Sequence, residues 1–156
     1  MEYIKRILVI SRMDPYSRKV VHFGVSLARK NKAELLILHL VTDPVRVMAV
    51  NVPGLFPVLE YPDYRDIVID AKCLLDKIIE EEISGGFPIK ELTSYNDPVE
   101  EILKVVRDEK IDLIVMNAHE EGRFEHALFG SENDAIVRKM PCSILLVKNN
   151  PETEDW

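Results

Sequence analysis

The chain has 156 residues, of which 47% are hydrophobic and 30% are charged, a balance typical of one globular domain with a buried core. Lysine and arginine number 20 against 27 aspartates and glutamates, so the formal net charge is −7. A surface this acidic opposes binding to nucleic acid or anionic membranes, and no apolar run approaches the roughly 20 residues of a membrane span. We therefore expect neither kind of partner.

The first predicted element is a strand over Tyr3–Ile10. A helix follows, and its core-facing stripe consists of Val20, Phe23, Leu27 and Ala28. Gly24 occupies the remaining position of that stripe. A second apolar run predicts a strand over Glu34–Leu40.

The segment Thr42–Asp63 interrupts this alternation, because it contains four prolines and several apolar residues. A connection this long is usually a functional lid or a mobile loop. Its apolar content indicates that it packs on something. Whether that is this subunit or a partner remains open.

The second half of the chain resumes the alternation. A helix with the stripe Ala71, Leu74, Leu75, Ile78 and Ile79 is ended by Gly85 and Gly86. A strand over Ile89–Ser94 precedes a third helix, in which Asp97 is the predicted N-cap ahead of Pro98. The apolar stripe of that helix consists of Val99, Ile102, Leu103 and Val106.

The remaining elements are a strand over Ile111–Met116, a helix opened by Gly130 and Ser131, and a strand over Ser143–Val147. Several strands are continuous apolar runs, as expected when both faces are covered. The alternation predicts a single-domain α/β fold with a mainly parallel five-stranded sheet and helices on both faces. Residues 1–150 form the expected domain, and residues 151–156 an acidic tail.

The Gly130-Ser131 pair stands where α/β proteins often bind a phosphate, because the first N–H groups of a helix lack internal partners and the helix dipole is positive there. The preceding loop opposes this function. His119, Glu120 and Glu121 bring charge where a phosphate site would need bare backbone.

The order of elements and the C-terminal motifs resemble the universal stress protein family over nearly the whole chain. The most specific parts are DLIVMN at 112–117, GS at 130–131 and IVRKMPCSILLVK at 136–148. The resemblance implies a Rossmann-like fold and, for many family members, ATP bound through a motif G-x2-G-x9-G-[S/T]. The spacing is kept here, with Asn117 and Glu120 at the first two glycines.

These replacements differ in severity. Asn117 is mild, since asparagine tolerates positive φ better than most residues. Glu120 brings bulk and negative charge toward the phosphates, and Glu132 offers a carboxylate to the same helix N-terminus. The resemblance also implies an aspartate after the first strand that contacts the nucleoside. Arg12 stands in its place and is an alternative ligand for a phosphate or carboxylate, as is Arg123.

Two alternatives for the site at the carboxyl ends of strands one and four remain open. In one, it still takes an adenine nucleotide, ATP being the cofactor that the resemblance implies. The residues expected to bind it are Ser11, Val41, Met116, Asn117, Gly130 and Ser131. In the other, ATP binding is lost and the protein is a regulatory module acting through its surfaces or another ligand. The replaced glycines and the missing aspartate favour weakened or lost ATP binding.

Enzymatic function has little support in the sequence. Slow nucleotide hydrolysis would require Glu120 or His119 as a base or metal ligand, and no GxSxG, Walker A or GxGxxG motif occurs. His22 and His39 are better explained as structural histidines. His119 and His126 match no metal-binding spacing. We predict no catalytic residue and no metal.

The last predicted strand suggests self-association. SILLV at 143–147 would be an aggregation-prone edge unless covered, and in the resembled family the last strand often lies at a dimer contact. We expect a homodimer paired through Ser143–Val147. The start MEYIKRILVI lacks a signal-peptide layout, and Cys73 and Cys142 form no CxxC motif. These features predict a cytoplasmic protein with free thiols.

Overall fold

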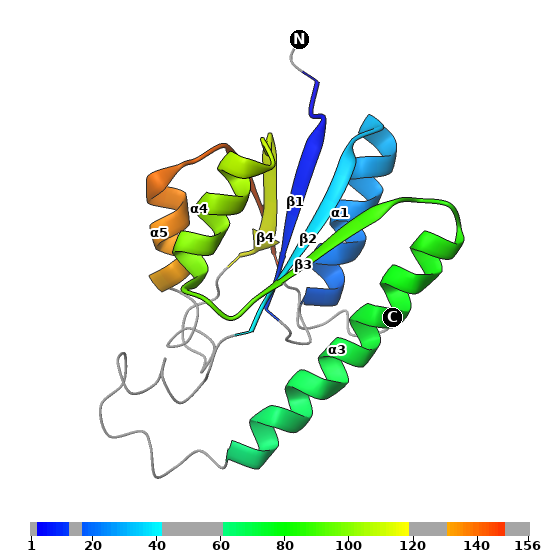
Figure 1. Cartoon of the computed structure of the whole chain (residues 1–156), viewed down its shortest axis with the longest axis vertical. Helices are drawn as coiled ribbons and strands as arrows, with labels where there is room; N and C mark the ends of the chain where they lie inside the picture. Colours follow the sequence, from blue (N-terminus) through cyan, green and yellow to red (C-terminus); the bar gives the residue numbers. More distant parts are fainter. Residues whose placement is uncertain (1–2, 13–16, 42–60, 119–130, 149–156) are drawn as a thin grey trace.

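The computed structural model describes residues 3–12, 17–41, 61–118 and 131–148. They form a three-layer α/β/α domain in which one sheet lies between two pairs of helices (Figure 1). The elements, in chain order, are β1 (Arg6–Ser11), α1 (Ser17–Asn31), β2 (Glu34–Leu40), α3 (Tyr61–Ser84), β3 (Ile89–Ser94), α4 (Pro98–Asp108), β4 (Leu113–Asn117), α5 (Ser131–Lys139) and β5 (Ser143–Val147). The predicted fold class is confirmed.

The five strands are all parallel, in the order β3-β2-β1-β4-β5. The chain therefore builds outward from β1 to one edge, then crosses back to place β4 on the other side of β1. Ligands of open α/β sheets bind outside the carboxyl ends of the strands where this reversal occurs. In this chain the reversal lies between β1 and β4.

Each face of the sheet has its own apolar core, which explains the continuous apolar runs. Along β1, Ile7 and Val9 pack with α1 and α3, whereas Leu8 and Ile10 pack with α4 and α5. Successive side chains of a strand point to opposite faces, so a strand covered on both sides needs apolar residues throughout. Figure 1 shows α4 and α5 together on one side of the sheet and α1 and α3 on the other.

The strand bounds agree with the sequence for β2, β3 and β5 and differ for the other two. β1 begins at Arg6 rather than at Tyr3, which is 75% exposed, since its register with β2 starts at the pair Arg6 and Glu34. β4 begins two residues later than predicted and ends one residue later. Of the segment Thr42–Asp63, the last three residues belong to α3, and the rest lie outside the described residues.

The predicted stripe of α1 was wrong at Phe23, which is 43% exposed. The buried side of this helix instead consists of Val20, Val21, Gly24, Val25 and Ala28. The centre of the buried side is therefore shifted by one residue relative to the prediction, and Phe23 lies at its edge. In α4, Val105 is buried and was missed. In α3, Leu75, Ile78 and Ile79 are buried as predicted, while the side chains of Ala71 and Leu74 lie outside the description.

The predicted helix ends are confirmed. The Asp97 side chain accepts a hydrogen bond of 3.0 Å from the Glu100 N–H at the start of α4. α3 ends at Ser84, and Gly86 follows with a φ of 89°, a conformation that favours glycine. Among the described helices, none is both long and apolar enough to cross a bilayer.

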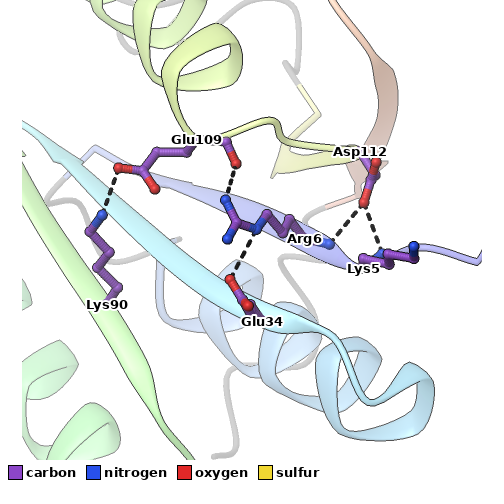
Figure 2. Close-up of polar contacts among 6 residues, drawn as sticks. All are labelled: Lys5, Arg6, Glu34, Lys90, Glu109 and Asp112. Carbon is purple, nitrogen blue, oxygen red and sulfur yellow. Dashed lines mark hydrogen bonds and ion pairs between the residues drawn. The ribbon is translucent and has the colours of Figure 1, made fainter.

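The amino ends of the strands are tied together by polar contacts (Figure 2). Asp112, just before β4, accepts hydrogen bonds from the backbone N–H groups of Lys5 and Arg6 at 2.8 and 2.9 Å. The Arg6 guanidinium lies between the Glu34 carboxylate, at 3.0 Å, and the Glu109 carbonyl, at 2.7 Å. This edge therefore carries structural contacts, and the candidate site lies at the opposite edge.

Replacing Asp112 with alanine is expected to destabilise the protein by about 1–3 kcal/mol, because two N–H groups lose a charged acceptor. Urea unfolding followed by circular dichroism measures the change. Asp108→Ala is a matched control on an exposed carboxylate at the end of α4 and should stay within about 0.5 kcal/mol of the wild type. Equal effects of the two variants would contradict this role for Asp112.

Candidate functional site

Two of the predicted site residues are the last residues of the neighbouring strands β1 and β4. These strands pair in parallel as far as Val9 opposite Val115. Ser11 ends β1 and Asn117 ends β4, two residues beyond this last pair. Ser11 is fully buried and Asn117 is partly buried. The strand ends thus place polar groups at the point where α/β folds bind ligands.

An ion pair crosses this site from β1 to α5. The Arg12 guanidinium, immediately after β1, donates to a carboxylate oxygen of Glu132 in the first turn of α5. The two side chains are only 7% and 14% exposed. The Arg12 N–H also donates to the Ser17 hydroxyl at 3.0 Å, which fixes the start of α1 against the end of β1. Arg12 is therefore held inside the site rather than in solvent.

The environment of Glu132 disfavours its charge. Burial raises the pKa of the Glu132 carboxyl above its ordinary value, and the nearby carboxylate of Asp97 acts in the same direction. The Arg12 guanidinium lowers this pKa by attraction and by hydrogen bonding, but the loss of hydration is the larger effect. The ion pair is thus present at a net cost to the carboxylate, as is common for buried pairs.

Asn117 joins the last strand residue of β4 to α5. Its carbonyl accepts a hydrogen bond of 3.0 Å from the side-chain amide of Asn133. Asn117 is a strand residue, and the non-glycine residues with positive φ in the described ranges are Lys32, Lys110 and Met140. The tolerance of asparagine for positive φ is therefore not what this position uses.

The other predicted site residues lie in different settings. Met116 is buried in the core beneath α4 and α5, so only its backbone belongs to the strand end. The Val41 N–H donates to the Ser94 carbonyl at 2.9 Å, just beyond β2. Ser131 begins α5, but its side chain, together with Gly130, Glu120, His119 and Arg123, lies outside the described residues.

His39 has the structural role expected of it. It is buried on β2, beside Ser11 in the register, and its Nε2 lies 2.9 Å from a Glu91 carboxylate oxygen on β3. His22 is instead exposed on α1. No group of three or more potential metal ligands occurs among the described residues, and His119 and His126 fall outside them.

A depression of about 500 Å³ lies between α1 and α3, away from the ends of β1 and β4. Its lining residues are His22, Val25, Ser26, Arg29, Lys30 and Glu82. Arg29 pairs with Glu82 and lies 5.4 Å from the centre of the Phe87 ring. The Arg29–Glu82 ion pair joins the two helices and neutralises two of the charges that line the depression.

Sequence reasoning identified Arg12 and Glu132 separately but missed that they bind each other. The two residues are 120 positions apart. A signal was available, because Arg12 follows the carboxyl end of a strand, Glu132 lies in the first turn of a helix that follows another strand of the parallel sheet, and the two carry opposite charges. The contribution of Asp97 was also missed, since it depends on how α4 and α5 lie side by side.

Comparison with protein families and curated proteins gives a consistent result. The family model described as the universal stress protein family matches residues 4–148. Universal stress protein C of Escherichia coli is 27% identical over 143 residues, which are 90% of this chain and 93% of that protein. Universal stress protein MJ0577 of Methanocaldococcus jannaschii is 32% identical over 79 residues, which are 51% of this chain and only 49% of that protein.

Solved structures agree at the level of the fold. UspA from Lactobacillus plantarum superposes with a TM-score of 0.66 at 24% identity, covering 94% of this chain and 99% of that one. A universal stress protein in complex with cAMP gives 0.60 at 17% identity, covering 96% and 100%. A family protein from Arabidopsis thaliana with AMP bound gives 0.60 at 15% identity, covering 97% of each chain.

Proposed function

This chain belongs to the universal stress protein family, and on that premise we propose that it is a binding or regulatory module in which adenine-nucleotide binding is weakened or lost. The ligand class is suggested by the neighbours that hold cAMP and AMP. ATP is the ligand that would test the proposal most directly. The proposed site lies at the carboxyl ends of β1 and β4.

The observation that carries this proposal is the ion pair between Arg12 and Glu132. A family aspartate that would contact the nucleoside is replaced by Arg12, whose side chain is buried and bound to Glu132. Glu132 also places a carboxylate in the first turn of α5, where an anion would otherwise be favoured. We expect both changes to weaken the binding of an anionic nucleotide at the position where related proteins would bind it.

If the site still binds a nucleotide weakly, we propose that the residues expected from the sequence contact it. They are Ser11, Val41, Met116, Asn117, Gly130 and Ser131. Of these, Ser11 and Asn117 are supported by their positions at the carboxyl ends of the neighbouring strands β1 and β4. Met116 is restricted to backbone contact, since its side chain is buried in the core.

Calorimetric titration with ATP and Mg²⁺ at about pH 7.5 tests this proposal, after bound nucleotide has been excluded by the absorbance ratio of the purified protein. We expect a dissociation constant of about 1 mM or weaker, roughly 4 kcal/mol of binding free energy or less. Micromolar binding would overturn the proposal, because the Arg12–Glu132 pair would then not obstruct the nucleotide.

We further propose that the protein forms a homodimer through β5. β3 and β5 are the two edge strands, and they differ in character. β3 exposes Lys90 and Glu91, charges that protect an edge, whereas β5 exposes Leu146 to 47%. An apolar edge of this kind is best covered by a second copy that pairs with it.

Replacing Leu146 with lysine is expected to give a monomer of 17.9 kDa in sedimentation at micromolar concentration, while the wild type sediments at twice that mass. The matched control is Thr93→Lys on the other edge strand, which should leave the dimer intact. A monomeric wild type would contradict the proposed dimer.

We also propose a cytoplasmic location and free thiols. Cys73 is exposed and Cys142 is partly buried, and both are unpaired. Burial raises the pKa of the Cys142 thiol, which keeps it in the unreactive protonated form. Cell fractionation with antibody detection tests the location, and recovery in the membrane or secreted fraction would contradict it.

A further inference from the structure

We propose that Arg12 is the anion-binding residue of this site and that Glu132 is an internal carboxylate which a phosphate-bearing ligand must replace, so that anion binding strengthens as Glu132 takes up a proton. The inference rests on the proposed function, since it concerns the same site. It adds the side chain of this chain that would bind the anion, Arg12, and the condition under which that anion binds.

The first support is the nature and position of Arg12. Its guanidinium is always charged at physiological pH, and its planar arrangement of N–H donors suits carboxylate and phosphate equally well. The side chain is only 7% exposed, yet it is at the strand end where α/β proteins bind ligands. Among the described residues, a group that the Arg12 guanidinium binds there is the Glu132 carboxylate.

The second support is the position of Glu132. It lies in the first turn of α5, a helix of nine residues, so its carboxylate shares the favourable field of the helix N-terminus with Arg12. A phosphate oxygen would need these same two partners. Glu132 therefore competes with an external anion for both of them.

The third support is the balance of charge around Glu132. The charged groups that act on it in the described part of the chain are Arg12, after β1, and Asp97, ahead of α4. Asp134, on its own helix, is exposed. With Glu132 ionised, these described groups comprise the Arg12 guanidinium and the two carboxylates of Glu132 and Asp97, a balance that disfavours an added anion. Protonation of Glu132 removes one negative charge and leaves the Arg12 guanidinium without that carboxylate charge.

The fourth support is that Glu132 gives up its charge readily. Burial raises its pKa, and the attraction of Arg12 does not reverse that shift. The carboxyl is therefore protonated at a higher pH than an ordinary glutamate. Geometry and charge balance together make the ion pair an arrangement that protonation of Glu132 opens to an anion.

Calorimetric titration with sulfate tests the inference, because the charge of sulfate does not change between about pH 8 and about pH 6. Both values lie above the isoelectric point of 5.1, so the protein keeps its negative net charge. For the wild type we expect the affinity to rise on going to the lower pH, because the protonated fraction of Glu132 grows as the pH approaches its raised pKa. Inorganic phosphate and AMP, compared at the lower pH, then identify the source of the phosphate group.

Three variants separate the roles of the residues. Glu132→Gln should bind sulfate at the higher pH at least as well as the wild type does at the lower pH, and its affinity should change less than about twofold between them. Arg12→Gln should bind sulfate at least about tenfold more weakly than the wild type at the lower pH. Asp134→Asn, a neutralised carboxylate on the exposed side of α5, should keep the wild-type pH profile.

The inference is overturned if Glu132→Gln keeps the wild-type pH profile, since a histidine would then account for it. It is also overturned if Arg12→Gln binds sulfate as the wild type does. Micromolar ATP binding at about pH 7.5 would instead contradict the proposed function while leaving the sulfate result standing. Tighter binding of AMP than of phosphate supports a nucleotide as the ligand, and equal binding supports the phosphate group alone.

Discussion

Replacing Arg12 with leucine is expected to lower the free energy of unfolding by about 3 kcal/mol at neutral pH. The variant leaves the Glu132 carboxylate buried, 14% exposed and near Asp97, without the guanidinium that it now binds. Removing one partner of a buried ion pair costs more than the pair itself contributes, because the remaining charge keeps its full desolvation penalty. Urea unfolding at constant ionic strength measures the loss.

The two partners should not behave alike. Glu132→Gln is expected to change stability by less than about 1 kcal/mol at neutral pH, because the burial that raises the pKa of Glu132 already outweighs the attraction of Arg12. The double variant, Arg12→Leu with Glu132→Gln, should therefore be more stable than Arg12→Leu alone. A double variant less stable than Arg12→Leu would contradict this account of the site.

The pH dependence of stability has a definite sign. The pKa of Glu132 is higher in the folded state than in an unfolded chain, so the folded protein binds the additional proton. The stabilisation that comes from this proton is fully present below the pKa that Glu132 has in the unfolded chain. It is lost as the pH rises through the higher pKa that Glu132 has in the folded protein. The substitution Arg12→Leu raises the pKa of Glu132 further, so lowering the pH should bring the stability of this variant closer to that of the wild type. The substitution Glu132→Gln should abolish the part of the pH dependence that Glu132 causes.

Replacing Gly24 with alanine is the second large expected effect, a loss of about 2 kcal/mol. A Cβ at this position would lie 2.2 Å from the Cγ2 of Val9, far inside van der Waals contact. Val9 is fully buried on β1, and its β-branched side chain has little freedom to turn away. The gain of about 1 kcal/mol in helix propensity is too small to offset the clash.

A double variant isolates this contact. The variant Val9→Ala lacks the Cγ2 methyl that would clash. In that background, Gly24→Ala should therefore lower the free energy of unfolding by at least about 1 kcal/mol less than it does in the wild type. Ser26→Ala, at an exposed position of the same helix, is the control and should stay within about 0.5 kcal/mol of the wild type. Thermal and urea unfolding provide the measurement. A neutral Gly24→Ala would show that α1 can move away from β1 at little cost.

Much of the fold follows from local sequence signals. The run LLIL within Glu34–Leu40 predicts a strand covered on both faces, and the structure confirms it with the same bounds. Asp97 followed by Pro98 predicts the start of α4, because the cap requires only an acceptor side chain next to the helix. Signals of this kind depend on residues a few positions apart, so the sequence contains them in full.

The rotation of a helix about its axis depends on its neighbour. Phe23 continued the apolar stripe of α1 in the sequence, yet it is at the rim. At Gly24, α1 approaches β1 so closely that no room is left for a Cβ beside Val9, so Gly24 faces the sheet and Phe23 does not. Periodicity locates such a stripe within about one residue, and packing then selects its centre.

By itself, the sequence determined the family, the alternation of strands and helices, and the identity of the residues at the carboxyl ends of β1 and β4. Only the tertiary structure decided that Arg12 binds Glu132 and that Asp97 acts on the same carboxylate. The physical reason is distance along the chain. Charges 120 residues apart interact only after the sheet has brought β1 between β2 and β4 and laid α5 beside α4, and burial then sets the strength of their interaction.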